Sequence, residues 1–270
     1  MAIAIAVALA ASYGVLLLMA ALLADRMLFP APASSYTDSA AILKLKTADG
    51  VTISAAYLKN HDARYTILFS HGNGEDIGRD WGAWEQLRDA GFSVFAYDYH
   101  GYGTSGGSPS EQAAYADIDA AYDYLTGPLA VPPGRIIVYG RSVGSGPSVD
   151  LASRRPVGGL VLEAAFTSAF RIVMLGALMP WDKFCNIDKI GKVSCPVLVI
   201  HGRRDAIVPF SHGQRLYTAA GGPKRCLWLD EAGHNDCLLA AGPEYYQALR
   251  ELAALADWRP EGNEKSGIPE

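Results

Sequence analysis

Short apolar runs recur along the chain and are separated by segments of helical or turn composition. Runs of four to eight apolar residues predict strands that are buried on both faces, as in a parallel sheet. Strands that alternate with helices predict a mostly parallel central sheet with helices on both faces, an α/β fold. The predicted strands are 65–70, 92–97, 136–139, 159–163, 196–200 and 225–229, and the predicted helices are 81–90, 110–125, a helix running through 151, and 244–255.

Two further segments, 42–47 and 51–58, alternate apolar and polar residues on either side of Ala48-Asp49-Gly50. This alternation predicts a hairpin with Gly50 in the turn, placed as an antiparallel edge of the sheet. The interval between the strands 159–163 and 196–200 is short, so we expect no large cap domain there.

The N-terminal segment 2–24 contains no charged residue and almost no polar one. A helix of this length spans roughly 33 Å at ~1.5 Å per residue, which is enough to cross a bilayer core. No Lys or Arg precedes the run, whereas a signal peptide begins with a positive region. We therefore expect a single-pass N-terminal membrane anchor, with a signal sequence, cleaved near Ala31-Pro-Ala33 or left uncleaved, as the alternative. The side of the membrane stays open, because Arg26 is the only nearby cation.

Length and charge limit the remaining possibilities. The chain has 270 residues, a net charge of -5 and no basic run, which argues against a nucleic-acid partner. We expect an anchor at 1–27, a linker at 28–40, one catalytic domain at 41–257, and a polar, disordered tail at 258–270.

Candidate chemistry centres on Gly140-Arg141-Ser142-Val143-Gly144, which lies between a predicted strand and a predicted helix. A Gly-x-Ser-x-Gly segment in that position is the sequence signature of a nucleophile elbow, a sharp turn that exposes the serine at the carboxyl edge of the sheet. The same pattern occurs at 103–107, but a polar, glycine-rich stretch precedes it and Pro109 follows soon after. That composition is typical of a loop, so we assign the nucleophile to Ser142 and place Ser105 in a loop near the sheet edge.

A serine nucleophile needs a base, and in folds with this elbow the histidine comes last along the chain. Only His212 and His234 are late enough. His234 follows the last strand, beside a glycine that lets the loop bend toward the sheet, and we predict it as the base. His212 stands at a helix start, where we expect an exposed or capping side chain.

The acid that orients the base should follow the serine and lie at the same sheet edge. Asp205 stands in the loop directly after the strand 196–200, so we predict it as the acid. Asp230 is a competitor beside the base loop. Asp182 and Asp188 precede the strand and would lie at its opposite end.

Acyl transfer also requires donors for the negative charge that forms on the substrate oxygen. The N–H of Val143 follows the nucleophile directly. The loop 71–76 follows the third strand and contains two glycines, and from it we predict the Asn73 N–H as the second donor. For His71 and His201, which each precede a glycine at a strand end, we expect structural hydrogen bonds.

Several motifs occur together in the order that one family shows. They are SHGNGED (70–76), YDYHGYGTSGGSPS (97–110), GRSVGSGP (140–147), LEAAFTS (162–168), HGRRDAIVP (201–209) and GHND (233–236). With them the chain resembles the α/β-hydrolases, most of all the membrane-anchored serine hydrolases of the BEM46 type, and is similar to the ABHD13 and ABHD17 hydrolases. The resemblance covers about residues 28 to 257. It implies the α/β-hydrolase fold, a Ser142–Asp205–His234 triad and association with a membrane.

Two positions depart from that resemblance. His100 stands where such sequences are expected to have an arginine. The palmitate-removing activity of the ABHD17 hydrolases is tied to a cysteine-rich, lipidated N-terminus, whereas this N-terminus has no cysteine. That specific activity is therefore not carried over.

The interval before the strand 196–200 is rich in large apolar residues, which could form an acyl-binding wall or the outer face of a core helix. The predicted substrate contacts are Phe166, Phe170, Met174, Trp181 and Phe184. We expect a serine hydrolase acting on small-molecule or lipid acyl esters or thioesters. A serine peptidase or a non-catalytic binding protein on the same fold are the alternatives.

The four cysteines, at 185, 195, 226 and 237, lack metal-site spacing, and we expect neither a metal nor a cofactor. A disulfide between Cys226 and Cys237, which flank the base loop, stays open at this stage.

Overall fold

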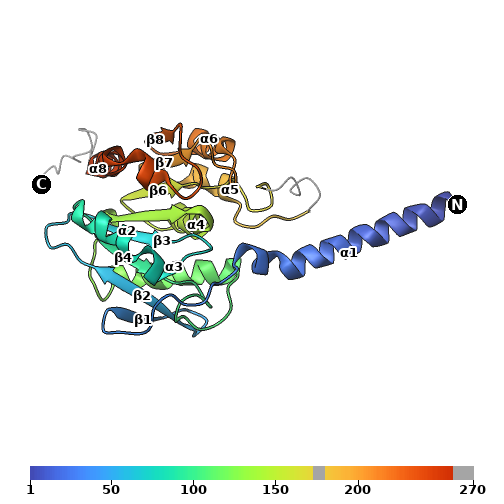
Figure 1. Ribbon diagram of the computed structural model, residues 1–270, viewed down its shortest axis with the longest axis horizontal. Coiled ribbons are helices and arrows are strands. Elements are labelled where there is room, and N and C mark those ends of the chain that lie inside the picture. The colour runs from blue at the N-terminus through green and yellow to red at the C-terminus, as the bar shows by residue number, and fades with distance from the viewer. Residues whose placement is uncertain (173–179, 258–270) are drawn as a thin grey trace, which may run out of the picture.

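A central sheet of eight strands organises the molecule (Figure 1), and the computed structural model describes residues 1–172 and 180–257. The strand order is β1-β2-β4-β3-β5-β6-β7-β8, and every pair from β4 to β8 is parallel. The strands are β1 (Ile42–Lys46), β2 (Thr52–Leu58), β3 (Thr66–Ser70), β4 (Ser93–Tyr97), β5 (Ile136–Arg141), β6 (Gly159–Glu163), β7 (Val197–Gly202) and β8 (Lys224–Leu229).

The predicted hairpin is present at one edge of this sheet. Strands β1 and β2 pair antiparallel, with Ile42 opposite Ala56, and β2 pairs antiparallel with β4. The central strands β3, β4 and β6 are buried at every position, as their continuous apolar composition predicts.

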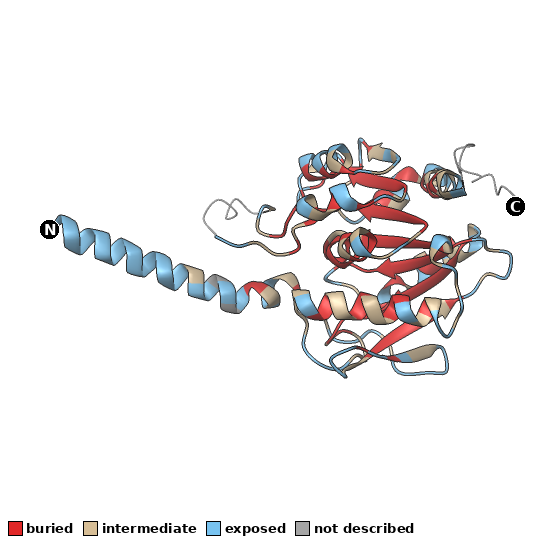
Figure 2. Cartoon of the chain, turned by 180° about the vertical axis from the view of Figure 1, so that it is seen from behind, coloured by how far each residue is buried: buried red, intermediate tan, exposed pale blue. Residues whose placement is uncertain are grey.

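Helices cover both faces of the sheet. The described helices are α1 (Ala2–Leu28), which projects from the domain, and α2 (Ile77–Asp89), α3 (Glu111–Thr126), α4 (Ser145–Arg154), α5 (Asn186–Lys189), α6 (Phe210–Ala219), α7 (Cys237–Ala241) and α8 (Pro243–Asp257), with short 3₁₀ turns η1 (Pro133–Arg135), η2 (Ser142–Gly144) and η4 (Ile190–Lys192). One apolar core forms beneath α3, α4 and α6, and a second forms beneath α2, α7 and α8. Figure 2 shows the buried strands enclosed between these helices.

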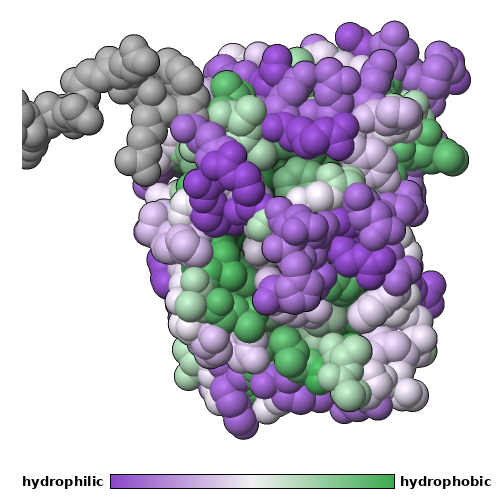
Figure 3. All heavy atoms as spheres, turned by 90° about the vertical axis from the view of Figure 1, so that its left-hand side faces the viewer, coloured by the Kyte–Doolittle hydropathy of each residue, from purple (hydrophilic) through white to green (hydrophobic). Residues whose placement is uncertain are grey.

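The helix α1 extends away from the domain, and most of its length is exposed (Figures 1 and 2). Its window Ala2–Met19 has a mean hydropathy of 2.4, and 0% of it is buried against the protein. In length and composition α1 could cross a membrane, a property that signal sequences share. The face of the domain turned away from α1 is mainly hydrophilic, with apolar groups in separate small patches (Figure 3).

Some boundaries differ from the sequence prediction. Helix α2 begins at Ile77 rather than at 81, because the Asp76 carboxylate accepts a hydrogen bond from Arg79 N (2.9 Å) and caps the helix. The short helices α5 and α7 were not predicted. In the described part of the interval between β6 and β7, the regular elements are α5 and η4, too short for a large cap domain. The tail expected at 258–270 and the predicted contact Met174 lie outside the described residues.

Candidate active site

The turn after β5 has the conformation of a nucleophile elbow. Ser142 has a φ of +51°, in the left-handed region that non-glycine residues rarely adopt. A side chain at Gly140 would place a Cβ 2.5 Å from Gly144 O, and one at Gly144 would place a Cβ 2.1 Å from Ser70 O of β3. Both glycines are therefore required for the backbones of β5, α4 and β3 to lie this close together.

The three residues predicted as nucleophile, base and acid lie in one chain of hydrogen bonds. His234 Nε2 is 3.0 Å from Ser142 Oγ, and His234 Nδ1 is 2.8 Å from Asp205 Oδ2. With Nδ1 protonated, the imidazole donates to the carboxylate, and its Nε2 is free to accept the serine proton. The arrangement can remove a proton from Ser142 and stabilise the imidazolium that results.

Asp205 is held by donors on several sides. Its Oδ1 accepts hydrogen bonds from the N–H groups of Ile207 (2.9 Å) and Val208 (2.7 Å). Its Oδ2 also lies 3.3 Å from His201 Nε2, which in turn is 2.9 Å from Val208 O. Burial alone would raise the pKa of Asp205, but the hydrogen bonds from His201 and His234 outweigh it and hold that pKa well below its usual value. Asp205 therefore stays ionised beside the base.

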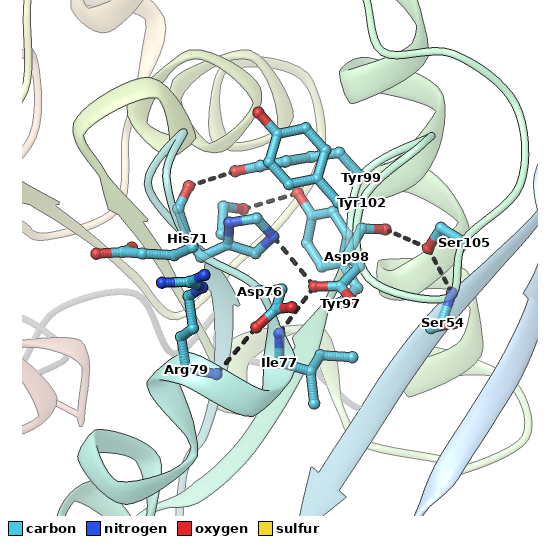
Figure 4. A network of polar contacts seen from close by, with 12 residues as sticks. Ser54, His71, Asp76, Ile77, Arg79, Tyr97, Asp98, Tyr99, Tyr102 and Ser105 are labelled. Atoms are coloured by element: carbon cyan, nitrogen blue, oxygen red, sulfur yellow. Dashed lines mark hydrogen bonds and ion pairs between the residues drawn. The ribbon is translucent and has the colours of Figure 1, made fainter. Parts of the chain in front are cut away.

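The loop 71–76 borders the same cavity as Ser142, and buried tyrosines fix its shape (Figure 4). Tyr99 donates its hydroxyl proton to His71 O (2.7 Å), and Tyr102 donates to Asn73 O (2.9 Å). These bonds orient the 71–72 and 73–74 peptide groups, which lie on either side of the Gly72–Asn73 peptide. Asn73 and Val143, the two predicted oxyanion donors, both line the cavity above Ser142.

A buried ion pair lies under this loop. His71 Nε2 is 3.3 Å from Asp98 Oδ1, and the same oxygen accepts from Ile77 N (2.9 Å), the first residue of α2 (Figure 4). Burial would lower the pKa of His71, but Asp98 raises it above its ordinary value. His71 therefore serves as a structural support, as the sequence led us to expect.

Arg141, the residue before Ser142, connects three loops around the cavity. Its guanidinium pairs with Glu75 (2.6 Å), and it donates to Asn235 Oδ1 (3.3 Å) in the base loop. Glu75 also accepts a hydrogen bond from Gly72 N (2.7 Å) in the loop of the candidate oxyanion donor. Burial would lower the pKa of Arg141, but Glu75, Glu163 and Asp80 raise it, so the side chain remains charged. This role of Arg141 was not predictable from the sequence, because it depends on contacts between distant segments.

A further carboxyl group, Asp80 on α2, lies near Arg141. Asp80 Oδ1 lies 3.9 Å from Arg141 Nη1, and its side chain is largely buried. Burial and the nearby Glu75 carboxylate raise the pKa of Asp80 to about 7. Three carboxyl groups, those of Glu75, Asp80 and Glu163, therefore surround Arg141, and Glu75 makes the shortest contact with it.

A cavity of about 270 Å³ opens over Ser142 and has one apolar wall. That wall contains Phe166 of the predicted substrate contacts, together with residues that were not predicted: Leu28, Ile172, Ile207 and Val208. Phe184 instead is fully buried against Gly146 of α4 and does not line the cavity. Phe170 and Trp181 also lie outside its lining.

The sequence expectation for His212 was wrong. The side chain is 6% exposed, and its Nδ1 accepts a hydrogen bond from Thr167 N (3.1 Å), so it fastens the loop after β6 to α6. Burial lowers the pKa of His212, which favours this neutral, accepting form. All four cysteines are free thiols, and the described residues contain no cluster of three or more His, Cys, Asp or Glu side chains that could hold a metal ion.

Comparison with known proteins places this chain in a family. A family model described as serine aminopeptidase, S33, matches residues 61–185. Alpha/beta hydrolase domain-containing protein 17B of Xenopus tropicalis is 38% identical over 223 residues, which are 81% of this chain and 77% of that protein. The human 17B protein is 37% identical over 225 residues, 82% of this chain and 77% of its own length.

Solved structures show the same fold at low sequence identity. The esterase Pf2001 of Pyrococcus furiosus superposes with a TM-score of 0.70 at 19% identity, covering 84% of this chain and 98% of that one. An esterase of Exiguobacterium antarcticum gives a TM-score of 0.60 at 16% identity, covering 78% and 98%. The sequence relatives and the common fold together establish that this chain is an α/β-hydrolase of the family that includes alpha/beta hydrolase domain-containing protein 17.

Proposed function

We propose that this α/β-hydrolase cleaves carboxylic ester or thioester bonds of acyl substrates through a Ser142–His234–Asp205 triad. The observation that supports this best is the unbroken chain of hydrogen bonds from Ser142 Oγ to His234 (3.0 Å) and from His234 to Asp205 (2.8 Å), at the floor of a cavity with one apolar wall. This arrangement supplies Ser142 with a base and leaves space beside it for an acyl group.

In the first half-reaction, Ser142 Oγ attacks the acyl carbonyl carbon while His234 Nε2 takes the hydroxyl proton. The carbonyl oxygen becomes an oxyanion, which accepts hydrogen bonds from the N–H groups of Val143 and Asn73. When the tetrahedral intermediate collapses, His234 passes its proton to the departing alcohol or thiol. The acyl group is left as an ester of Ser142.

The second half-reaction regenerates the enzyme. A water molecule gives a proton to His234 Nε2 and attacks the acyl carbonyl, and the carboxylic acid leaves as Ser142 takes the proton back. Asp205 remains ionised throughout, consistent with its lowered pKa, and stabilises the positive imidazole in both halves.

Serine peptidase activity is the second candidate, favoured by the name of the family model that matches residues 61–185. An aminopeptidase needs a carboxylate to bind the substrate's ammonium group. Among the described residues that line the cavity, Glu75 is the carboxylate, and it already binds Arg141 (2.6 Å) and Gly72 N (2.7 Å). The site therefore favours neutral acyl esters and thioesters over peptide N-termini.

Labelling with a fluorophosphonate probe tests the nucleophile. We expect the wild-type protein and Ser105→Ala to be labelled and Ser142→Ala to remain unlabelled. Labelling of Ser142→Ala at the wild-type level would refute the assignment. Parallel assays with p-nitrophenyl esters, acyl thioesters and aminoacyl anilides then decide the bond type, and a preference for the anilides would favour the peptidase.

We further propose that α1 keeps the enzyme on a membrane, because its Ala2–Met19 window is apolar and unburied. The full chain should stay with the membrane fraction after washing with alkaline carbonate. Release into the wash, or an N-terminus that begins after residue 28, would contradict this proposal.

A further inference from the structure

The last turn of α1 is docked on the catalytic domain, although most of the helix is exposed (Figures 1 and 2). Ala24 and Phe29 are each 3% exposed, whereas Met27 is 73% exposed. Asp25 forms an ion pair with Lys183 Nζ at 2.7 Å. An apolar and an ionic contact thus fix the end of the helix to the segment that precedes α5.

Phe29 lies between the two sides of the candidate active site. On one side its ring packs edge-on against Tyr99 (5.9 Å between centroids) and Tyr102 (6.3 Å), the tyrosines that hold the loop 71–76. On the other side it packs against Phe184 (5.9 Å), which neighbours Phe166 (6.5 Å) in the cavity wall. One residue at the end of α1 therefore supports both the oxyanion side and the acyl side.

Leu28 makes direct contact with the site, since it lines the cavity together with Ser142, Phe166 and Ile207. It follows the uncharged apolar segment 2–24 by four residues. At 1.5 Å per residue this is about 6 Å along the helix, about the thickness of one headgroup layer. With α1 in a bilayer, Leu28 and the cavity that it lines lie close to the lipid surface.

We propose that the end of α1 is a working part of the acyl-binding site. Leu28 is the wall along which a linear acyl chain lies, and Phe29 with the Asp25–Lys183 pair holds that wall in place. The enzyme then selects acyl chains long enough to reach Leu28, entering from the lipid surface beside α1. This inference rests on the proposed serine hydrolase function.

The test uses the full chain in detergent micelles and compares kcat/KM for p-nitrophenyl decanoate with that for p-nitrophenyl acetate. Leu28→Ala removes three carbons from the wall, so the decanoate-to-acetate ratio should fall about tenfold. Met27→Ala is the matched control, because Met27 is the exposed neighbour in the same turn, and its ratio should equal that of the wild type. Partition of the decanoate into micelles is common to all variants and cancels.

The ion pair is tested by charge exchange. Asp25→Lys and Lys183→Asp should each lower the decanoate-to-acetate ratio at least threefold, and the double exchange should restore it. An unchanged ratio in Leu28→Ala, or a double exchange no better than the singles, overturns the inference. Fluorophosphonate labelling of every variant separates the two proposals: failure to label the wild type removes the serine hydrolase function, whereas normal labelling with an unchanged ratio removes only the role of α1.

Discussion

Two segments of this chain share the pattern Gly-x-Ser-x-Gly but differ in backbone conformation. At 140–144 the serine itself is left-handed, with a φ of +51°. At 103–107 the two outer glycines are left-handed instead, with φ values of +51° and +78°. The left-handed residue differs between the two turns, and Ser142 faces a cavity, whereas Ser105 is turned toward the backbone of β2.

The contacts of the two serines follow from this difference. Ser105 Oγ accepts a hydrogen bond from Ser54 N (2.8 Å) and donates to Asp98 O (3.2 Å), so its hydroxyl group joins a loop to the sheet (Figure 4). Ser142 Oγ bonds to His234 instead. A pattern of small residues thus specifies a tight turn, and the elements on either side decide whether its serine faces a cavity or joins a loop to the sheet.

Removing each hydroxyl group should give the largest contrast. Ser142→Ala should lower kcat/KM for an acyl ester ~10⁴- to 10⁶-fold and leave the fold stable. Ser105→Ala should keep the activity but lower the free energy of unfolding by about 1–3 kcal/mol, because the Ser54 N–H and the Asp98 C=O lose their partner. Ester kinetics and urea denaturation of both variants measure this. Similar kinetic losses in the two would show that the segments are not functionally distinct.

The next largest difference between the two segments is expected for substitutions of their outer glycines. In Gly144→Ala the new Cβ would lie 2.1 Å from the backbone oxygen of Ser70, which cannot move without disturbing β3. We expect Gly144→Ala to lower the free energy of unfolding by about 3 kcal/mol or more. We also expect this variant to lose its reaction with the fluorophosphonate probe. Gly107→Ala meets side chains rather than backbone, the His100 ring at 2.5 Å and Val51 Cγ1 at 3.2 Å, and strains a φ of +78°. Its cost should be about 1–2 kcal/mol, with labelling retained.

Features that depend on a local sequence pattern were the ones that could be predicted. The strands, the turn at Ser142 and the positions of Asp205 and His234 beside it were predictable, because each depends on a local pattern and on the rule that loops at one sheet edge converge. Helix α2 was placed four residues too late, although Asp76 is a standard capping residue, because Gly78 and Gly82 weaken the helical pattern that follows it.

The cavity wall and the Arg141 contacts were not predictable in the same way. Leu28 lies 114 positions before Ser142, and nothing in its local pattern distinguishes it from the other apolar residues of α1. Phe184 and Phe166 were both predicted as cavity residues because they are large and apolar, yet of the two only Phe166 lines the cavity. Such assignments depend on which side chains tertiary packing turns outward.

The residue before each serine should give a smaller contrast. Arg141→Met frees Glu75 and with it the loop 71–76, so kcat should fall about 10- to 100-fold while KM changes little. Arg141→Lys, which keeps the charge, should recover part of the loss. Thr104→Val removes hydrogen bonds with Ser54 and Asp38 at the surface and should leave kcat unchanged. If Arg141→Met has a normal kcat, or Lys rescues nothing, the ion pair with Glu75 does not position the loop.

The smallest contrast concerns His100, which packs beneath Gly107. Its Nδ1 is 2.5 Å from Asp117 Oδ1 on α3, and its Nε2 is 3.3 Å from Asp49 Oδ2 in the β1–β2 turn. The hydrogen bond with Asp117 raises the pKa of His100 above its unfolded value of about 6.5. The ion pairs therefore stabilise the fold fully below about pH 6.5, and this contribution is lost as the pH rises through the folded pKa.

Urea denaturation at pH 6 and pH 9 tests this assignment, with His100→Arg as the variant. A guanidinium keeps its charge at both pH values, so the wild type should lose more stability than His100→Arg between them. The exposed His61→Arg is the control and should match the wild type. Parallel pH dependences in the wild type and His100→Arg would show that the loop at 103–107 does not depend on the charge of His100. Labelling of Ser142 should be the same in all three proteins, because this histidine supports the loop and not the elbow.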